Sequence, residues 1–171
     1  MSDKKTDIFI GANDEVYTLE KVIAEIKQFL EDDPQGKYSL VIGTDSQEKF
    51  DTGNGKKHIN LVTAIVVRRH GFGGRYFWQK KNQENIHTLR DKIYAETLVS
   101  LDFAKEFVPM LKKTLNKTSP KYDLEIHVDV GERGTTRDMI KEVVGMVTGY
   151  GFVAKTKPYS YAASSVADKY T

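Results

Sequence analysis

Four acidic residues occupy positions from which their carboxylates could act together. Asp45 directly follows the apolar run 38–44, and Asp129 ends a second apolar run further along the chain. Glu96 lies at the margin of a helical apolar stripe, and Asp168 follows small residues that would let its helix approach a sheet closely. Carboxylate oxygens are the ligands that Mg²⁺ and Mn²⁺ prefer, and the chain has no cysteine to favour zinc. The sequence thus indicates a site for a hard divalent cation.

Asp45 and Asp129 are the strongest pair, because we expect them to end neighbouring strands about 4.8 Å apart. Two carboxylates at about 4 Å repel each other by roughly 4 kcal/mol at an effective dielectric constant near 20. Either one of them binds a proton, or a cation lies between them. A divalent ion is the more economical solution.

Each of these residues also has a purely structural explanation. Asp45 could accept hydrogen bonds in a turn, Glu96 could face solvent, and Asp168 could be a surface charge near the chain end. His127 lies two residues before Asp129, on the same side of its strand, and could be a structural histidine. The convergence of all four acids on one place is harder to explain structurally.

The order of the predicted elements decides whether these acids can meet. Thr18 is a plausible N-cap for a helix with an apolar stripe, and "DPQGK" ends that helix. Apolar runs, turn residues and changes of period then predict the remaining elements. We expect strands at 38–45, 58–69 and 75–81, a helix at 86–115, a strand at 121–130, a helix at 135–150, a strand at 151–157 and a last helix at 160–170.

This order predicts an α/β fold with a five-stranded mixed sheet and helices on both faces. The first three strands are joined by short connections and should form an antiparallel meander. The last two must enter through helical crossovers, so they run parallel to the first strand. Placing them on its free side gives the strand order 3-2-1-4-5. Asp45 and Asp129 then lie at the carboxyl ends beside the switch point, where sites form in such sheets.

The composition is that of a globular protein of about one domain. The 171 residues are 39% hydrophobic and 29% charged, and no apolar run approaches the 18 residues that a membrane span requires. The N-terminal stretch lacks the apolar segment of a secretory signal, so a cytoplasmic location without membrane partners is the default expectation.

Positive charge is concentrated in the middle of the chain. Between Lys56 and Lys92 there are nine Lys or Arg residues and two acids, whereas the rest carries 17 basic and 22 acidic residues. Such a segment favours a polyanionic partner such as nucleic acid, although lysines and arginines also protect exposed sheet edges. The residues that could grip a nucleic-acid backbone here are Arg68, Arg75, Lys80 and Lys81.

The element order, together with its four acids, resembles the ribonuclease H-like fold. More narrowly, "VIGTDSQ", "YAET", "HVDVGERGTTRDMI" and "KPYSYAASSVADKYT" are similar to the YkuK-like family of predicted ribonuclease H-related proteins found in bacteria. The resemblance implies a ribonuclease H-like domain over residues 38–171, with residues 1–37 as an N-terminal helical extension packed on it.

The wider family implies hydrolysis of phosphodiester bonds with two ions of Mg²⁺ or Mn²⁺. By position, Asp45 would bridge both ions, Glu96 and Asp129 would bind one, and Asp168 would bind the other. Here Ser46 and Gln47 replace the Gly-rich turn usual after the first aspartate, which speaks against cleavage of RNA–DNA hybrids.

Further residues would assist in such a site. His127 or Tyr161 would orient water or phosphate. Arg133 and Arg137 lie where a loop enters a predicted helix N-terminus and could contact phosphate, or could pair with acids beside them in the sequence.

Three functions therefore remain in competition. The first is a divalent-metal-dependent nuclease, and the second is a non-catalytic nucleic-acid- or nucleotide-binding protein on the same fold. The third is a structural protein that uses the helix at 18–31 as an interface, and self-association into a homo-oligomer is compatible with each.

Overall fold

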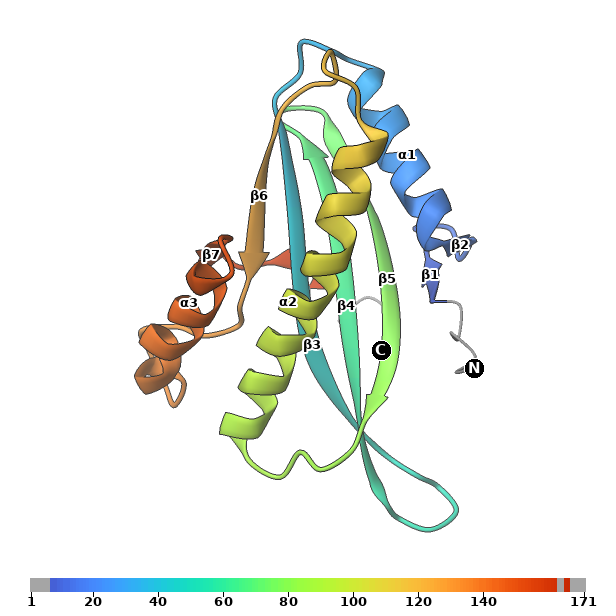
Figure 1. The fold of residues 1–171 in the computed structure, drawn as a ribbon. Helices are drawn as coiled ribbons and strands as arrows, with labels where there is room; N and C mark the ends of the chain where they lie inside the picture. Colours follow the sequence, from blue (N-terminus) through green and yellow to red (C-terminus); the bar gives the residue numbers. More distant parts are fainter. Residues whose placement is uncertain (1–6, 163–164, 167–171) are drawn as a thin grey trace.

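The computed structural model describes residues 7–162 and 165–166 and contains one mixed sheet. The strands lie in the order β2-β1-β5-β4-β3-β6-β7 (Figure 1). The elements are β1 (Ile8–Ile10), β2 (Val16–Thr18), α1 (Leu19–Glu31), β3 (Tyr38–Phe50), β4 (Lys57–Arg69), β5 (Gly73–Gln83), α2 (Leu89–Thr114), β6 (Tyr122–His127), the 3-10 helix η1 (Arg137–Met139), α3 (Ile140–Gly149) and β7 (Val153–Lys155).

The expected order of the five main strands is confirmed, but five strands is the wrong number. A short antiparallel hairpin, β1 with β2, extends the sheet beyond β5 through the pairing of Ile10 with Trp78. The N-terminal segment is therefore not only helical. Three-residue strands are too short to show a period of two in the sequence, which is why this hairpin was not predicted.

The strand that carries Asp45 is longer than predicted. β3 pairs with β4 residue by residue from Tyr38 opposite Arg69 to Phe50 opposite Lys57, so Asp45 lies inside a strand rather than at its end. The parallel pairing with β6 is shorter and stops at Gly43 opposite His127. Asp45 thus lies two residues beyond the last residue of β3 that pairs with β6, and the switch point between β3 and β6 is retained. The polar residues after Asp45 look like a loop in the sequence, but β4 pairs with them.

One face of the sheet holds the main core. α1 begins after Thr18, whose side chain accepts a hydrogen bond from the backbone of Lys21 as an N-cap. The apolar stripe of α1, the central part of α2 and residues of α3 are buried together against this face. In the described part of the chain, no helix combines the length and apolar character needed to cross a membrane.

The opposite face is covered near Asp45 by residues close to the C-terminus. Val62, Ala64 and Trp78 form a small buried cluster with Val166, and residues 162, 165 and 166 are helical. The described elements therefore place helical residues on both faces, as expected. The same arrangement brings the C-terminal segment beside the strand that carries Asp45.

Candidate functional site

Asp45 and Asp129 meet at the edge of β3 just beyond the end of β6. Gly43 and His127 are the last paired residues of these parallel strands, and each aspartate lies two residues further on. Both aspartates line one small cavity of about 10 Å³. Such a space holds about one water molecule or ion, so a substrate would have to bind on the surface above it. The remaining lining residues are Thr44, His127, Ser160, Tyr161 and Ala162.

Glu96 approaches the same edge from the other face of the sheet. Its Oε1 accepts hydrogen bonds from the backbone N–H of Ser46 at 3.0 Å and from the Ser46 hydroxyl at 2.6 Å. The same N–H also donates to Oδ1 of Asp45 at 2.9 Å. Because the two carboxylates share one donor, their oxygens lie within about 6 Å of each other.

The environment of Glu96 favours its protonated form. The residue is 3% exposed, and burial, reinforced by the negative charges of Asp45 and Asp129, raises its pKa to about 7. The hydrogen bond from Ser46 and the charge of Lys92 oppose this rise. A carboxyl group that titrates near neutral pH can exchange a proton for a cation under physiological conditions.

A layer of buried hydroxyls fixes α2 against β3 next to Glu96. The Thr44 hydroxyl is hydrogen-bonded to those of Thr63 at 3.0 Å and Ser100 at 2.8 Å. Ser100 lies four residues after Glu96, on the same side of α2. Since all three hydroxyls are buried and paired, they hold the part of α2 that carries Glu96 at a defined height on the strand.

Asp129 forms an ion pair with a residue that was not predicted from the sequence. Lys157 Nζ lies 2.9 Å from Asp129 Oδ1, and the two side chains are 55% and 34% exposed. The backbone brings them together, because the Lys157 N–H donates to the carbonyl of Val130. The lysine partly neutralises the acidic edge, the part of the sheet where Asp45, Glu96 and Asp129 lie close together, and it is accessible to a ligand.

His127 binds protein groups through both ring nitrogens. Nδ1 accepts from the backbone N–H groups of Tyr161, at 3.1 Å, and Ala162, at 3.4 Å, while Nε2 lies 3.0 Å from Glu125 Oε2. The Tyr161 ring packs edge-on against the imidazole. Burial lowers the pKa of His127, which favours the neutral ring that can accept at Nδ1. This histidine therefore anchors residues 161–162 beside Asp45, in line with the structural interpretation.

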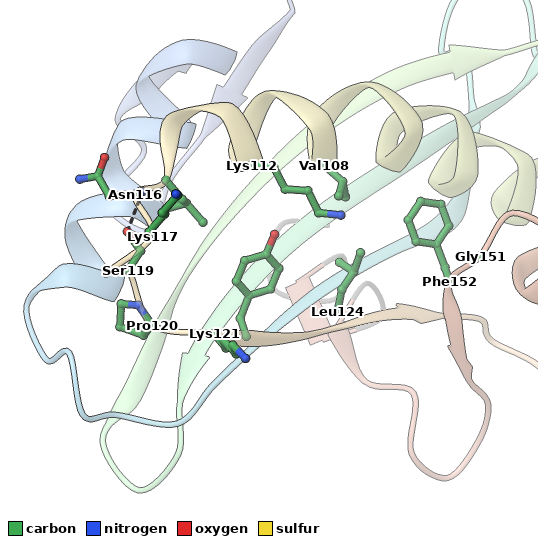
Figure 2. Close-up of a pocket in the computed structure, with 12 residues that line it drawn as sticks. Val108, Lys112, Asn116, Lys117, Ser119, Pro120, Lys121, Leu124, Gly151 and Phe152 are labelled. Carbon is green, nitrogen blue, oxygen red and sulfur yellow. Dashed lines mark hydrogen bonds between the residues drawn. The ribbon is translucent and has the colours of Figure 1, made fainter.

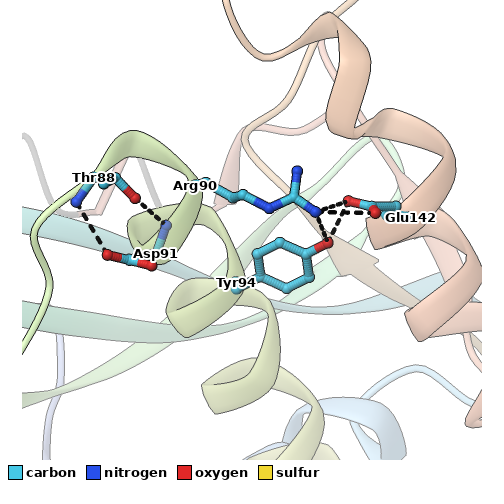
Figure 3. A network of polar contacts seen from close by, with 5 residues as sticks. All are labelled: Thr88, Arg90, Asp91, Tyr94 and Glu142. Carbon is cyan, nitrogen blue, oxygen red and sulfur yellow. Dashed lines mark hydrogen bonds and ion pairs between the residues drawn. The ribbon is translucent and has the colours of Figure 1, made fainter.

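A polar network joins the first turns of α2 and α3 (Figure 3). The Arg90 guanidinium donates to both carboxylate oxygens of Glu142 at 2.9 and 3.0 Å, and the Tyr94 hydroxyl donates to the same carboxylate. α2 itself starts with a capping box between Thr88 and Asp91. The network connects the helix that carries Glu96 to the helix that follows the loop after Asp129.

The predicted arginines of that loop face solvent. Arg133 and Arg137 are exposed, and neither guanidinium forms an ion pair within the described residues. The expected alternative, pairing with adjacent acids, is thus not seen there. Helix formation begins at Arg137 as a 3-10 turn, close to the predicted start.

The basic residues of β4 and β5 are spread over the sheet. Lys80 lies in the same row of the sheet as Asp45, because Val62 of β4 is the register partner of both residues. Burial lowers the pKa of Lys80. Arg68 is paired with Ser39, six residues before Asp45 on β3, or about 20 Å along the strand. Arg75 likewise lies near that far end, and Lys81 pairs with Asp7 at 3.4 Å. Of this predicted group, Lys80 shares a row with the candidate site.

The donor set has the chemistry of a magnesium site but is not arranged as one. Across residues 7–162 and 165–166, no three His, Asp or Glu side chains form a group that could hold a metal ion. Glu96 is turned toward Ser46 and Asp129 toward Lys157. Asp168, the fourth predicted ligand, lies outside the described residues.

A larger cavity lies at the other end of the sheet. Its volume is about 570 Å³, and its lining includes Tyr122 and Leu124 at the start of β6 (Figure 2). Asp129 follows the opposite end of that strand, so the two sites are roughly 20 Å apart along the strand direction. This cavity therefore does not belong to the acidic site.

Two residues of the site were missed in the sequence. Ser46 was noted only as a departure from a Gly-rich turn, yet its hydroxyl binds Glu96. Lys157 follows the strand next to β6, so its place at a carboxyl end could have indicated it.

Comparison with known proteins agrees with this architecture. The family description "Ribonuclease H-like" matches residues 21–171. The chain is 33% identical over 172 residues to "Uncharacterized protein YkuK" of Bacillus subtilis (strain 168), with 96% of each protein covered. No solved structure matches the chain. The relative's name states no activity, so it supports the family and no particular substrate.

Proposed function

The chain belongs to the ribonuclease H-like family, and on that basis we propose that it is a divalent-metal-dependent nuclease that hydrolyses phosphodiester bonds. The observation that carries the proposal is the state of Glu96. A buried carboxyl group with a pKa of about 7 lies beside two further carboxylates at the switch point of the sheet. Burial of a carboxyl group costs stability, and groups with such a raised pKa are concentrated at functional sites.

Asp45, Glu96 and Asp129 are the described residues that would hold Mg²⁺ or Mn²⁺, with Asp168 as the fourth proposed ligand. A pair of such ions would polarise the phosphodiester and lower the pKa of an attacking water. Glu96 has to lose its proton to serve as a ligand, which its pKa of about 7 permits near neutral pH. Ser46 holds the carboxylate at the strand edge in either state.

The surrounding residues would bind and orient the nucleic acid. Arg133, in the loop after Asp129, and Arg137, at the start of η1, are exposed and could donate to phosphate oxygens. Lys157 could exchange its contact with Asp129 for a phosphate when a cation neutralises the acids. His127 would act indirectly, by holding residues 161–162 against the site.

The direct test is cleavage of end-labelled single-stranded, duplex, hybrid and branched nucleic acids with Mg²⁺ or Mn²⁺. We expect at least one substrate to be cut, and Asp45→Asn and Glu96→Gln to lower the rate at least 100-fold. Asp102→Asn, an exposed acid on α2, is the matched control and should cut like the wild type. Absence of cleavage on every substrate, or equal cleavage by Asp45→Asn, would refute the proposal.

A non-catalytic nucleic-acid-binding protein is the second candidate. It is favoured by the engagement of Glu96 and Asp129 with Ser46 and Lys157, together with the absence of a three-ligand group in the described part of the chain. In that case binding should weaken with salt and survive Asp45→Asn, because lysines and arginines would supply the affinity. Mn²⁺ should then leave the melting temperature unchanged, whereas a bound ion would raise it.

A further inference from the structure

The 570 Å³ cavity is built between the end of α2, the start of β6 and the turn before β7. Figure 2 shows Lys112 and Val108 on α2, Leu124 on β6 and Phe152 around a shared space. Its volume lies within the range of pockets that enclose small organic ligands. The sequence offered no motif for it, because its parts come from three separate segments.

The walls of this cavity are apolar and include two aromatic rings. Val108, Leu124, Tyr122 and Phe152 are partly or wholly buried on the face of the sheet that α2 covers. The hydroxyl of Tyr122 is neutral at physiological pH and can donate a hydrogen bond, and burial raises its pKa further. Leu115 and Pro120 complete the apolar part, which suits a flat ring system.

The rim of the cavity is positively charged. Lys112, Lys117 and Lys121 line it, and no lining residue is acidic. Within the described residues, none of these three lysines is part of an ion pair. Lysine binds phosphate as a mobile point charge, so this rim favours an anion such as a phosphate group, whose charge is about −1.5 to −2 near neutral pH.

The acidic side chains near this cavity point away from it or are paired with a lysine. Asp123 and Glu125 alternate with Tyr122 and Leu124 along β6, so their side chains leave the strand on the other face. Ser119 contacts the carboxylate of Glu31, which is itself paired with Lys27 at 3.8 Å.

We propose that this cavity binds a small molecule that combines an aromatic ring with a phosphate group, the chemistry of a mononucleotide. The ring packs against Phe152, Tyr122 and Leu124, and the phosphate is bound by Lys112, with Lys117 and Lys121 at the rim. This site is independent of the proposed nuclease site, since it uses none of the acids and requires no metal ion.

The experiment is a titration of the ¹⁵N-labelled full chain with adenosine 5′-monophosphate in EDTA, followed by amide chemical shifts. EDTA removes divalent ions and so excludes metal-dependent binding at the acidic edge. We expect saturable shifts clustered at residues 112–124 and 151–152. Adenosine, which lacks the phosphate, and inorganic phosphate, which lacks the ring, should each bind at least tenfold more weakly.

A charge-matched pair of variants completes the test. Lys112→Ala with Lys121→Ala should weaken binding of the nucleotide at least tenfold. Lys113→Ala with Lys141→Ala removes the same charge from exposed positions outside the cavity and should change the affinity less than twofold. The proposal is overturned by an absence of shifts at about 1 mM nucleotide, by shifts confined to residues around Asp45, or by equal weakening in both variants.

Discussion

Ser46 donates both its backbone N–H and its hydroxyl to Oε1 of Glu96, at 3.0 and 2.6 Å, although the two residues are 50 positions apart. This contact ties the middle of β3 to α2 where the sheet changes from antiparallel to parallel pairing. It also holds the carboxyl group of Glu96 in a buried position, where ionisation of that group costs free energy. Most of the testable behaviour of the acidic edge follows from it.

Glu96→Gln should make the protein more stable above pH 7. In the wild type the pKa of Glu96 is raised from 4.5 to about 7, so the folded chain holds an extra proton between these values and stability falls as pH rises through that window. The shift corresponds to about 3 kcal/mol, an upper value for the gain on removing the charge. Urea unfolding in EDTA at pH 5 and pH 8 measures it, and an unchanged difference between the two pH values in the variant would contradict the account.

Ser46→Ala should destabilise the chain more at pH 8 than at pH 5. Loss of a hydrogen bond to an ionised group costs about 1.5–3 kcal/mol, whereas the protonated carboxyl loses about half as much. Ser39→Ala is the control, because Ser39 is buried on the same strand but makes no side-chain hydrogen bond within the described residues. Equal losses in both variants at both pH values would show that the hydroxyl does not support Glu96.

His127 should make the attachment of residues 161–162 dependent on pH. Burial lowers the pKa of His127 below 6.5, so the stability of its contacts is complete above 6.5 and is lost as pH falls through the lowered value. Amide hydrogen exchange of Tyr161 and Ala162, corrected for intrinsic rates, should therefore be faster at pH 5 than at pH 7.5. His127→Phe keeps a ring but removes the acceptor, and should accelerate this exchange at least tenfold at pH 7.5.

Lys157→Met should increase the affinity of the acidic edge for divalent ions. The ammonium group neutralises Asp129 at 2.9 Å and so competes with a cation for the same oxygens. Because the pair is largely exposed, its loss should cost no more than about 1 kcal/mol of stability. Calorimetric titration with Mn²⁺ should show a dissociation constant several-fold lower than in the wild type. Weaker binding in Lys157→Met would mean that the lysine supports the ion site.

The central part of the fold was predictable because its strands and turns are specified by residues that are close together in the sequence. The apolar runs at 58–69 and 75–81 specify strands, and short loops specify the meander. Because β4 occupies one side of β3, the two strands that enter through helical crossovers, β6 and β7, lie on its free side. The placement of Asp45 and Asp129 in one cavity followed from the same rules.

The remaining features depend on partners that the sequence does not reveal. Residues 46–49 are polar and resemble a loop, yet they are strand because β4 pairs with them. Ser46 resembles a simple replacement of glycine until α2 brings Glu96 within hydrogen-bonding distance. The mononucleotide cavity arises where the ends of α2 and β6 meet, and its lysines look like ordinary surface residues in the sequence.

The alternation of side chains along β3 has a consequence for how this protein can evolve. Asp45 and Ser46 are adjacent but serve opposite faces of the sheet, one toward the C-terminal segment and the other toward α2. Insertion or deletion of a single residue in 38–44 would exchange these faces and disrupt the core and the acidic edge together. Changes of length should be tolerated instead in the exposed turn at 51–56 beyond both.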